Sequence, residues 1–228
     1  MESRKYKVIF FDFGGTLDYD GLNWEERAAK FAQMMGLKND PETLYEAGHS
    51  AIHSMYRDPM LITQSFPDTL SQFTAGMLDH LKCSDGKIHS EISRALYTES
   101  KDFLNRNLNL LKTLKSEYRM GVISNNFGNT AGWCNECGFG EVFHTIIDST
   151  LVGSRKPEPQ IFKIALERIN ASPEEALHVG DRYNADVTGA KGVGMSTVLI
   201  KPKGLEPSQD PQMVDYHIKS LLELKDIL

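Results

Sequence analysis

Residues 7–16 read KVIFFDFGGT, an apolar run followed by one acid and a pair of glycines. Residues 8–11 are β-branched or aromatic, which is typical of a strand buried on both faces of a parallel sheet. Asp12 follows directly, at the end of the strand where open α/β sheets bind their ligands. Gly14 and Gly15 then allow the backbone to turn tightly beside it. We predict that Asp12 is a nucleophile that faces a ligand across this turn.

The composition is that of a globular chain without a surplus of basic residues. Of its 228 residues, 40% are hydrophobic and 25% are charged, and the formal net charge is -6. This length suits a core domain that carries a smaller one. The acidic balance offers no attractive field to a nucleic-acid backbone, so we expect no nucleic-acid partner. Three cysteines, no hydrophobic leader and no apolar stretch of bilayer length predict a cytoplasmic protein without a membrane segment, of unknown oligomeric state.

Residues 21–104 show helical spacing of apolar side chains and no strand periodicity. Asn23 begins a capping-box pattern, and Pro41 occupies the first turn of a second helix. The helices predicted in this region cover residues 23–36, 40–57, 67–82 and 88–104. We therefore predict a helical-bundle cap domain over residues 21–104, inserted into a core formed by residues 1–20 and 105–228.

The second half of the chain alternates between helix and strand. The predicted helices cover residues 109–117, 129–137, 159–169 and 185–191, and the predicted strands cover residues 120–123, 145–147, 176–179 and 196–200. Repeated βα units of this length form parallel sheets with right-handed crossovers and helices on both faces. The predicted fold class is therefore α/β, with a Rossmann-like parallel-sheet core, to which strand 8–11 also belongs, and an inserted cap.

Polar side chains also follow the strand predicted at residues 120–123. Ser124, Asn125 and Asn126 come directly after it and offer a hydroxyl and two amides. Because the carboxyl ends of parallel strands meet at one edge of a sheet, we expect these groups to lie near Asp12.

Two later segments add charges at the same edge. Lys156 comes shortly before a helix that begins with proline, and an ammonium beside a helix N-terminus favours an anion. The strand at residues 176–179 is followed by Asp181, with Asp186 five residues further on. Two acids at this position suit Mg²⁺, which prefers oxygen ligands and keeps several of its waters.

These four segments, in this order and over nearly the whole chain, resemble the signature of haloacid dehalogenase-like (HAD) hydrolases with a helical cap. The resemblance implies that Asp12 is the nucleophile, that Ser124 hydrogen-bonds the phosphoryl oxygens and that Lys156 steadies the nucleophile and the phosphate. The Mg²⁺ ligands that it implies are Asp12, the backbone carbonyl of Gly14, Asp181 and Asp186. The residues expected to contact substrate are Gly15, Asn125, Asn126 and Arg182.

One position departs from the phosphatases of this family. They carry Asp-x-Asp-Gly-Thr, whereas residues 12–16 read Asp-Phe-Gly-Gly-Thr. The second acid of such enzymes protonates the leaving alkoxide and later takes a proton from water. General acid–base catalysis contributes about 10²- to 10⁴-fold in rate, so we expect slow hydrolysis of ordinary sugar phosphates unless another group serves. Asp18 and Asp20 are candidate replacements, although Asp18 is equally well explained as a turn acceptor.

The interpretation is therefore Mg²⁺-dependent, phosphatase-type hydrolysis of a small phosphorylated metabolite through an aspartyl-phosphate on Asp12. One alternative is a carbon–phosphorus hydrolase that resembles phosphonoacetaldehyde hydrolases, in which a cap lysine forms a Schiff base; Lys30, Lys38 and Lys82 lie in the predicted cap. The other is a non-catalytic regulatory protein that binds a phosphorylated metabolite. Haloacid dehalogenases lack the Gly-Asp pair found here at residues 180–181, which argues against metal-free dehalogenation.

Two residue pairs have a spacing that metal sites use. His49 and His53 are one helical turn apart, but no third ligand is evident, so polar roles facing the cap core or the substrate are favoured. Cys134 and Cys137 lack a partner pair, and we interpret them as the buried face of a helix.

Overall fold

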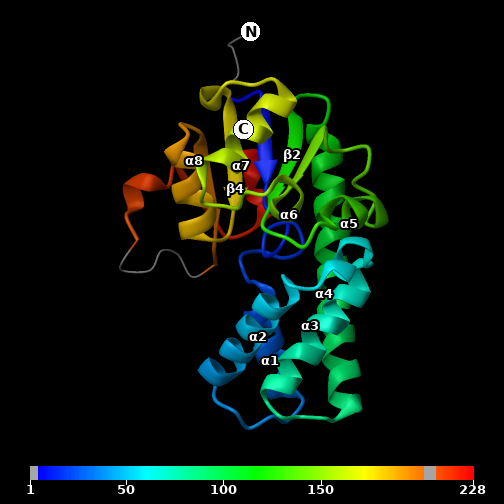
Figure 1. The fold of residues 1–228 in the computed structure, drawn as a ribbon. Helices are drawn as coiled ribbons and strands as arrows, with labels where there is room; N and C mark the ends of the chain where they lie inside the picture. Colours follow the sequence, from blue (N-terminus) through cyan, green and yellow to red (C-terminus); the bar gives the residue numbers. More distant parts are fainter. Residues whose placement is uncertain (1–4, 203–208) are drawn as a thin grey trace.

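The structure, a computed structural model, describes residues 5–202 and 209–228. Its core is a six-stranded sheet in the order β3-β2-β1-β4-β5-β6, in which every neighbouring pair is parallel (Figure 1). The strands are β1 (Val8–Phe11), β2 (Arg119–Ser124), β3 (Thr145–Asp148), β4 (Ala176–Gly180), β5 (Ser196–Ile200) and β6 (Tyr216–Ile218). The predicted α/β class is confirmed. Strand β6 was not predicted, because three residues with a central histidine give no strand periodicity.

The register of the sheet aligns the ends of its three central strands. Phe11, the last residue of β1, lies opposite Val122 of β2 and Val179 of β4. The chain therefore leaves all three strands at one edge of the sheet. That edge carries Asp12 after β1 and Asp181 after β4.

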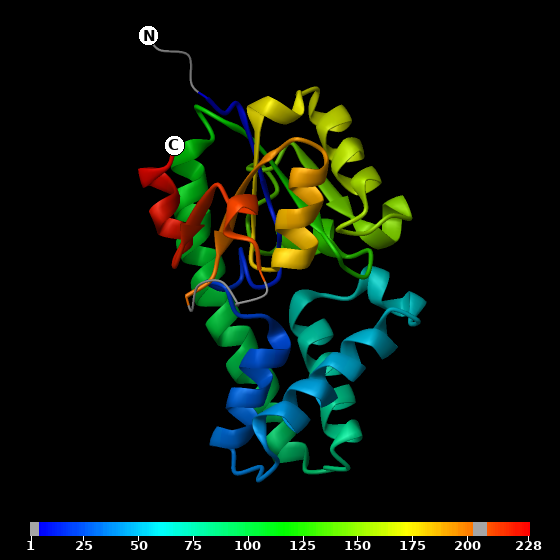
Figure 2. The ribbon, with the colours of Figure 1, turned by 90° about the vertical axis from the view of Figure 1, so that its left-hand side faces the viewer.

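Strand β1 is buried on both faces, as its four apolar residues predict. The helices that belong wholly to the core are α5 (Thr130–Glu136), α6 (Ser149–Val152), α7 (Pro159–Ile169) and α8 (Thr188–Gly192). Phe10 shares a buried cluster with Phe162 of α7, whereas Ile9 and Phe11 belong to the cluster on the opposite face. Figure 2 shows α7 and α8 on one side of the sheet and the C-terminal segment on the other. Truncating such a buried phenylalanine to alanine typically costs about 3–5 kcal/mol of stability.

Four helices follow β1 before the sheet resumes. They are α1 (Trp24–Met34), α2 (Pro41–Met55), α3 (Phe66–His80) and α4 (Gly86–Leu114), with a short 3₁₀ turn at Pro59–Thr63 before α3. The predicted capping box is present: Glu26 N donates to Asn23 Oδ1 at 2.9 Å, and Asn23 N donates to Glu26 Oε2 at 3.0 Å. These helices form a bundle next to the sheet edge that carries Asp12 (Figures 1 and 2).

Helix α4 corrects the prediction of separate helices at residues 88–104 and 109–117. It is continuous over 29 residues and contributes to both the bundle and the core (Figure 2). Tertiary contacts hold its polar middle: Asn107 donates to the carbonyl of Leu17 at 2.8 Å, and Arg106 binds Asp20. The predicted domain boundary at residue 105 therefore lies inside a helix. No helix of the described residues combines the length and apolarity needed to cross a membrane.

Four aromatic rings join the bundle to the core beside the loop after β1. The Trp133 ring centroid lies 5.4 Å from Phe13, 5.7 Å from Trp24 and 5.1 Å from Phe66. Aromatic pairs at such distances contribute about 0.5–1.5 kcal/mol each beyond their buried area. The loop that carries Asp12 is thus packed against α1, α3 and α5 at once.

Candidate active site

A cavity of about 320 Å³ is lined by residues of both the sheet edge and the helical bundle. The predicted site residues that line it are Asp12, Gly14, Ser124, Asn125, Asn126, Lys156 and Arg182. Gly15, Asp181 and Asp186 are not among the lining residues; the two acids are buried. Segments distant in sequence therefore meet at one place, as the strand ends predicted.

Lys156 is the cation at the centre of this group. Its side chain is 1% exposed, and Nζ lies 2.9 Å from Asp12 Oδ1 and 2.6 Å from Asp186 Oδ1. Burial alone would lower the pKa of Lys156, but the charges of Asp12 and Asp186 outweigh it and raise the pKa. The ammonium therefore stays protonated and draws two carboxylates together in a volume that excludes most water.

Asp186 is held from several sides. It lies in a π-helical turn, Tyr183–Val187, which replaces the first turn of the predicted helix. His178 Nε2 lies 2.9 Å from its Oδ1, and Arg182 N donates to its Oδ2 at 3.0 Å. Burial would raise the pKa of Asp186, but Lys156 and His178 outweigh it and lower the pKa. Because both of its oxygens are engaged, Asp186 orients Lys156 in this structure.

Asp181 has a free oxygen where Asp186 does not. Its Oδ1 is buried and, among the described residues, has no hydrogen-bond partner. Burial, followed by the charges of Asp12 and Asp186, raises the pKa of Asp181 well above its usual value. Burial also raises the pKa of Asp12 despite the opposing effect of Lys156. These carboxyl groups lack sufficient positive charge around them.

The donor set fits a hard divalent cation. One oxygen from each of Asp12, Asp181 and Asp186 lies within 4.8 Å of the others, and no other group of this kind occurs in the described residues. Of the three acids, Asp186 already has hydrogen-bond partners on both oxygens, which leaves Asp12 and Asp181 as the better placed ligands. Carboxylate oxygens with room for water are what Mg²⁺ prefers. A cation here would give the unpartnered oxygen of Asp181 a partner and offset the repulsion between the acids.

Two glycines permit this crowding. Gly15 has a φ of +74°, and a Cβ there would lie 2.5 Å from Asp181 Oδ2. A Cβ at Gly180 would overlap the carboxyl carbon of Asp186. Gly14 differs, because a Cβ added there meets no atom within 4 Å. Gly15 and Gly180 are thus required by the approach of the acids, whereas Gly14 leaves open space in the cavity wall.

The residues after β2 divide between the cavity and the support of the loop. Asn125 holds the backbone of Lys156 through two hydrogen bonds: Lys156 N donates to Asn125 Oδ1 at 2.8 Å, and Asn125 Nδ2 donates to the Lys156 carbonyl at 2.9 Å. Asn126 Nδ2 donates to Thr130 Oγ1 at 2.9 Å. Both amides thus have partners within the protein, although Asn125 and Asn126 line the cavity together with Ser124, the last residue of β2.

Sequence reasoning missed Asp148, which organises this loop from the end of β3. Its carboxylate accepts hydrogen bonds from Gly128 N at 3.0 Å, Thr130 N at 3.2 Å and Thr150 N at 3.0 Å. An isolated acid after a short strand gives no signal of such a role, because Gly128 and Thr130 come from another part of the chain.

The helical bundle closes the other side of the cavity. Its lining residues there include Asn23, Trp24, Glu25, His49, Ile52, His53 and Tyr56. Arg182 Nη2 donates to Glu25 Oε1 at 3.1 Å, and Tyr56 Oη donates to the Asn125 carbonyl at 3.0 Å. Glu25 and Tyr56 were not predicted as site residues, because acids in the first turn of a helix and tyrosines at the end of a helix are common without any ligand.

Asp18 and Asp20 do not line the cavity. Asp18 is fully buried and binds Arg27 at 3.1 Å, and its other oxygen accepts a hydrogen bond from Gly15 N at 2.6 Å. Asp20 binds Arg106 at 2.7 Å. Both acids hold the connection between sheet and bundle, so neither lies where it could replace the acid missing at Gly14.

A family profile described as hydrolase, haloacid dehalogenase-like hydrolase, matches residues 6–194. The chain belongs to the haloacid dehalogenase-like hydrolases. The sequence resemblance to the HAD family is thereby confirmed, and the match spans the loop after β1, the helical bundle and the segment that carries Asp181.

Two curated relatives of this HAD chain are named glyceraldehyde 3-phosphate phosphatase. The protein from Pyrococcus furiosus is 34% identical over 233 residues, which cover 99% of this chain and 94% of the relative. The protein from Methanothermobacter thermautotrophicus is 27% identical over 207 residues, which cover 90% and 89% of the two chains. Among solved structures, the HAD hydrolase YfnB from Bacillus subtilis, bound to magnesium, matches 99% of both chains with a TM-score of 0.62 and 20% identity. At that identity the likeness shows a shared fold.

Proposed function

We propose that this HAD hydrolase is a Mg²⁺-dependent phosphatase of small phosphorylated metabolites that acts through an aspartyl-phosphate on Asp12. The observation that carries the proposal is the placement of the Lys156 ammonium, 2.9 Å from Asp12 Oδ1, at a cavity that also exposes Ser124. This arrangement offers a nucleophilic carboxylate beside fixed donors for an anionic group.

The roles follow from the positions of the side chains. Asp12 attacks the phosphorus atom, while Lys156 and Ser124 bind the oxygens of the transferring group and stabilise its charge. Asp186 keeps the ammonium of Lys156 in place through its 2.6 Å contact. Asp12, the Gly14 carbonyl and Asp181 would hold Mg²⁺, which supplies charge neutralisation of the phosphate when bound.

The substrate class is supported by the size of the cavity and by the relatives. A cavity of about 320 Å³ lies at the lower end of ordinary ligand pockets, which measure about 300–1,000 Å³. The curated relatives are named for glyceraldehyde 3-phosphate. We infer a substrate of triose-phosphate size, with its phosphate at Asp12 and its remainder against the bundle.

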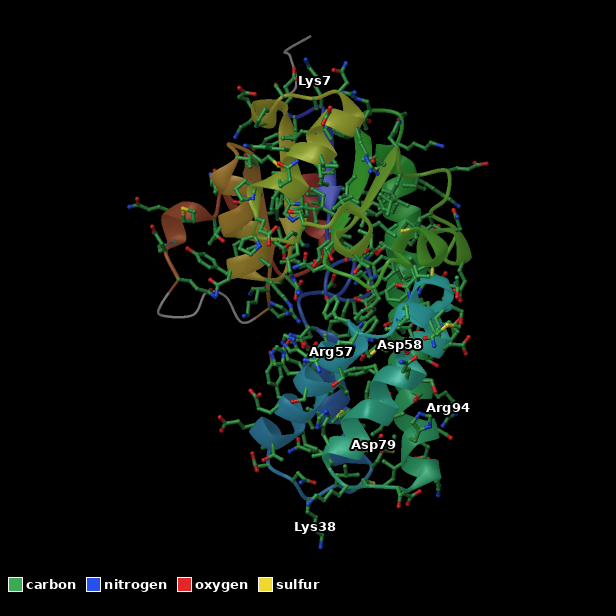
Figure 3. The ribbon with its side chains drawn as sticks, in the orientation of Figure 1. Lys7, Lys38, Arg57, Asp58, Asp79 and Arg94 are labelled. Atoms are coloured by element: carbon green, nitrogen blue, oxygen red, sulfur yellow. The ribbon has the colours of Figure 1, made fainter. Side chains whose placement is uncertain are left out.

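The carbon–phosphorus alternative finds less support. It needs a cap lysine that reaches the substrate, and none of Lys30, Lys38 and Lys82 lines the cavity. Lys38 lies at the far end of the bundle and points away from the core (Figure 3). Lys156 is the lysine among the lining residues, and its ammonium is bound by two carboxylates.

The test measures phosphate release from p-nitrophenyl phosphate and from glyceraldehyde 3-phosphate, with and without Mg²⁺. Asp12→Asn should lower kcat by at least about 10³-fold, because removing a nucleophile leaves only the residual electrostatic catalysis. Asp79→Asn changes an exposed acid of α3 (Figure 3) and serves as the matched control. Tight binding of phosphorylated metabolites without turnover would instead support the non-catalytic alternative, and unchanged activity of Asp12→Asn would exclude Asp12 from the mechanism.

A further inference from the structure

The bundle wall of the cavity carries two histidines in direct contact. The Nε2 atoms of His49 and His53 are 3.0 Å apart, so one ring donates a proton to the other. Both rings line the cavity that contains Asp12 and the open space at Gly14. Histidine is the side chain that most readily exchanges a proton near neutral pH. The pair therefore adds histidines to a cavity whose lining residues from the core include none.

The surroundings of His49 orient the pair. Its Nδ1 is buried without a hydrogen-bond partner in the described residues, and it faces Glu25 Oε1 at 3.7 Å. An acceptor oxygen beside Nδ1 favours the tautomer of His49 that carries its proton on that nitrogen. His49 Nε2 then accepts from His53 Nε2. This leaves Nδ1 of His53, an exposed residue of the bundle, as the atom that gains or loses a proton.

Neither a metal site nor simple packing explains the pair. In residues 5–202 and 209–228, the group that brings three ligand atoms within 4.8 Å of one another is that of Asp12, and it includes no histidine. A packing role would bury both rings, whereas the His49 side chain is 39% exposed. The ring of Tyr45 is stacked on that of His49 with 6.1 Å between centroids, which holds its orientation and leaves the ring edge open to His53 and Glu25. The charged groups that share the cavity with the pair are Asp12, Glu25, Arg155, Lys156 and Arg182.

We propose that His53, oriented by His49 and Glu25, is the general acid and base that replaces the acid absent at Gly14. This inference rests on the proposed phosphatase function and assigns its missing proton donor to the cap. The Asp12 carboxylate attacks phosphorus, and the bond from phosphorus to the leaving oxygen breaks. The departing alkoxide takes the proton from His53 and leaves as the alcohol.

The second half of the reaction returns the proton. A water molecule gives a proton to the neutral His53 ring while its oxygen attacks the phosphorus of the aspartyl-phosphate. The bond between phosphorus and the Asp12 oxygen breaks, which releases inorganic phosphate and restores the carboxylate. His53 ends the cycle protonated, as it began, and no other reactant is consumed.

The test compares two leaving groups. The kcat/KM value reports only the steps up to formation of the aspartyl-phosphate. Nitrophenolate can leave in that step without taking up a proton, whereas an alkoxide needs one. His53→Gln should lower kcat/KM for glyceraldehyde 3-phosphate by at least about 100-fold and for p-nitrophenyl phosphate by less than about 10-fold. It should also produce a burst of nitrophenolate equal to the enzyme concentration, since hydrolysis of the intermediate becomes slow.

Two further variants complete the experiment. His80→Gln replaces an exposed histidine of α3 that does not line the cavity, and it should leave both substrates unaffected. Gly14→Asp in the His53→Gln background should recover activity on glyceraldehyde 3-phosphate, because the carboxylate enters open space. If His53→Gln lost kcat/KM equally on both substrates, or lost none, the role of His53 would be refuted while the proposed function would stand. Failure of the unaltered protein to release phosphate from either substrate would refute the proposed function and this inference with it.

Discussion

Replacing Arg27 by methionine should destabilise the protein by about 3–5 kcal/mol, because it would leave the buried carboxylate of Asp18 without an opposite charge. Arg27 and Asp18 are 1% and 0% exposed, and their side chains are 3.1 Å apart. Arg27 also donates to Glu99 at 2.9 Å and to Ser100 at 2.9 Å. Methionine keeps much of the aliphatic volume, so the loss reports mainly the charge and its hydrogen bonds.

The size of this effect is set by burial, and the chain provides a control. Arg106 binds Asp20 through two hydrogen bonds of 2.9 and 2.7 Å, but its side chain is 31% exposed. Water can solvate Asp20 once the guanidinium is gone, so Arg106→Met should cost about 1 kcal/mol. The two arginine pairs are thus expected to differ several-fold in their contribution, although the more exposed pair has the shorter hydrogen bonds.

The assay is urea unfolding followed by circular dichroism, with the slope of the transition compared between variants. The double variant Asp18→Asn with Arg27→Met should be more stable than Arg27→Met alone, since it removes the stranded charge. Catalysis should also decline in Asp18→Asn, because Asp18 holds the backbone of Gly15 at 2.6 Å beside the nucleophile. A loss for Arg27→Met no larger than that for Arg106→Met would refute the argument from burial.

Two other predictions concern the cavity itself. Gly14→Asp alone should change kcat/KM for alkyl phosphates by less than about 10-fold, although the carboxylate enters open space, because His53 already supplies the proton; a rise of about 10²-fold in a phosphate-release assay would contradict this. Because the pKa of Asp181 is raised, its carboxyl group keeps a proton to higher pH. The affinity for Mg²⁺ should therefore decrease as the pH is lowered, and Mg²⁺ binding should release protons, which calorimetry in two buffers would measure. In the metal-free protein, the raised pKa of Asp181 lowers the stability of the fold at pH values above that pKa. This loss of stability should disappear as the pH falls through the pKa.

The sequence predicts the sheet edge well because its signals are local. A buried parallel strand must be apolar on both faces, and all four residues of β1 show this pattern. The polar residue that follows such a strand can lie only at its carboxyl end. Asp12, Ser124 and Asp181 were therefore predictable without knowledge of their neighbours.

Other features depend on contacts that the local sequence does not contain. The helix boundary expected near residue 105 is absent, because Arg106 and Asn107 find partners in the loop after β1 and the helix continues. Asn125 lines the cavity, and its amide also holds the backbone of Lys156, a role that the sequence does not indicate. Glu25 lines the cavity from the first turn of α1, where it pairs with Arg182 of a distant segment. Each of these outcomes is decided by tertiary structure.

The uninterrupted α4 limits how the cavity can open. From Gly86 to residue 104 the helix extends about 27 Å at 1.5 Å per residue. A rotation of the bundle by about 10° around the end of this segment would displace its far tip by about 5 Å, while atoms close to the pivot would move far less. Since a helix bends only at the expense of its backbone hydrogen bonds, any opening of the bundle away from the sheet would either strain this helix or tilt it against the sheet.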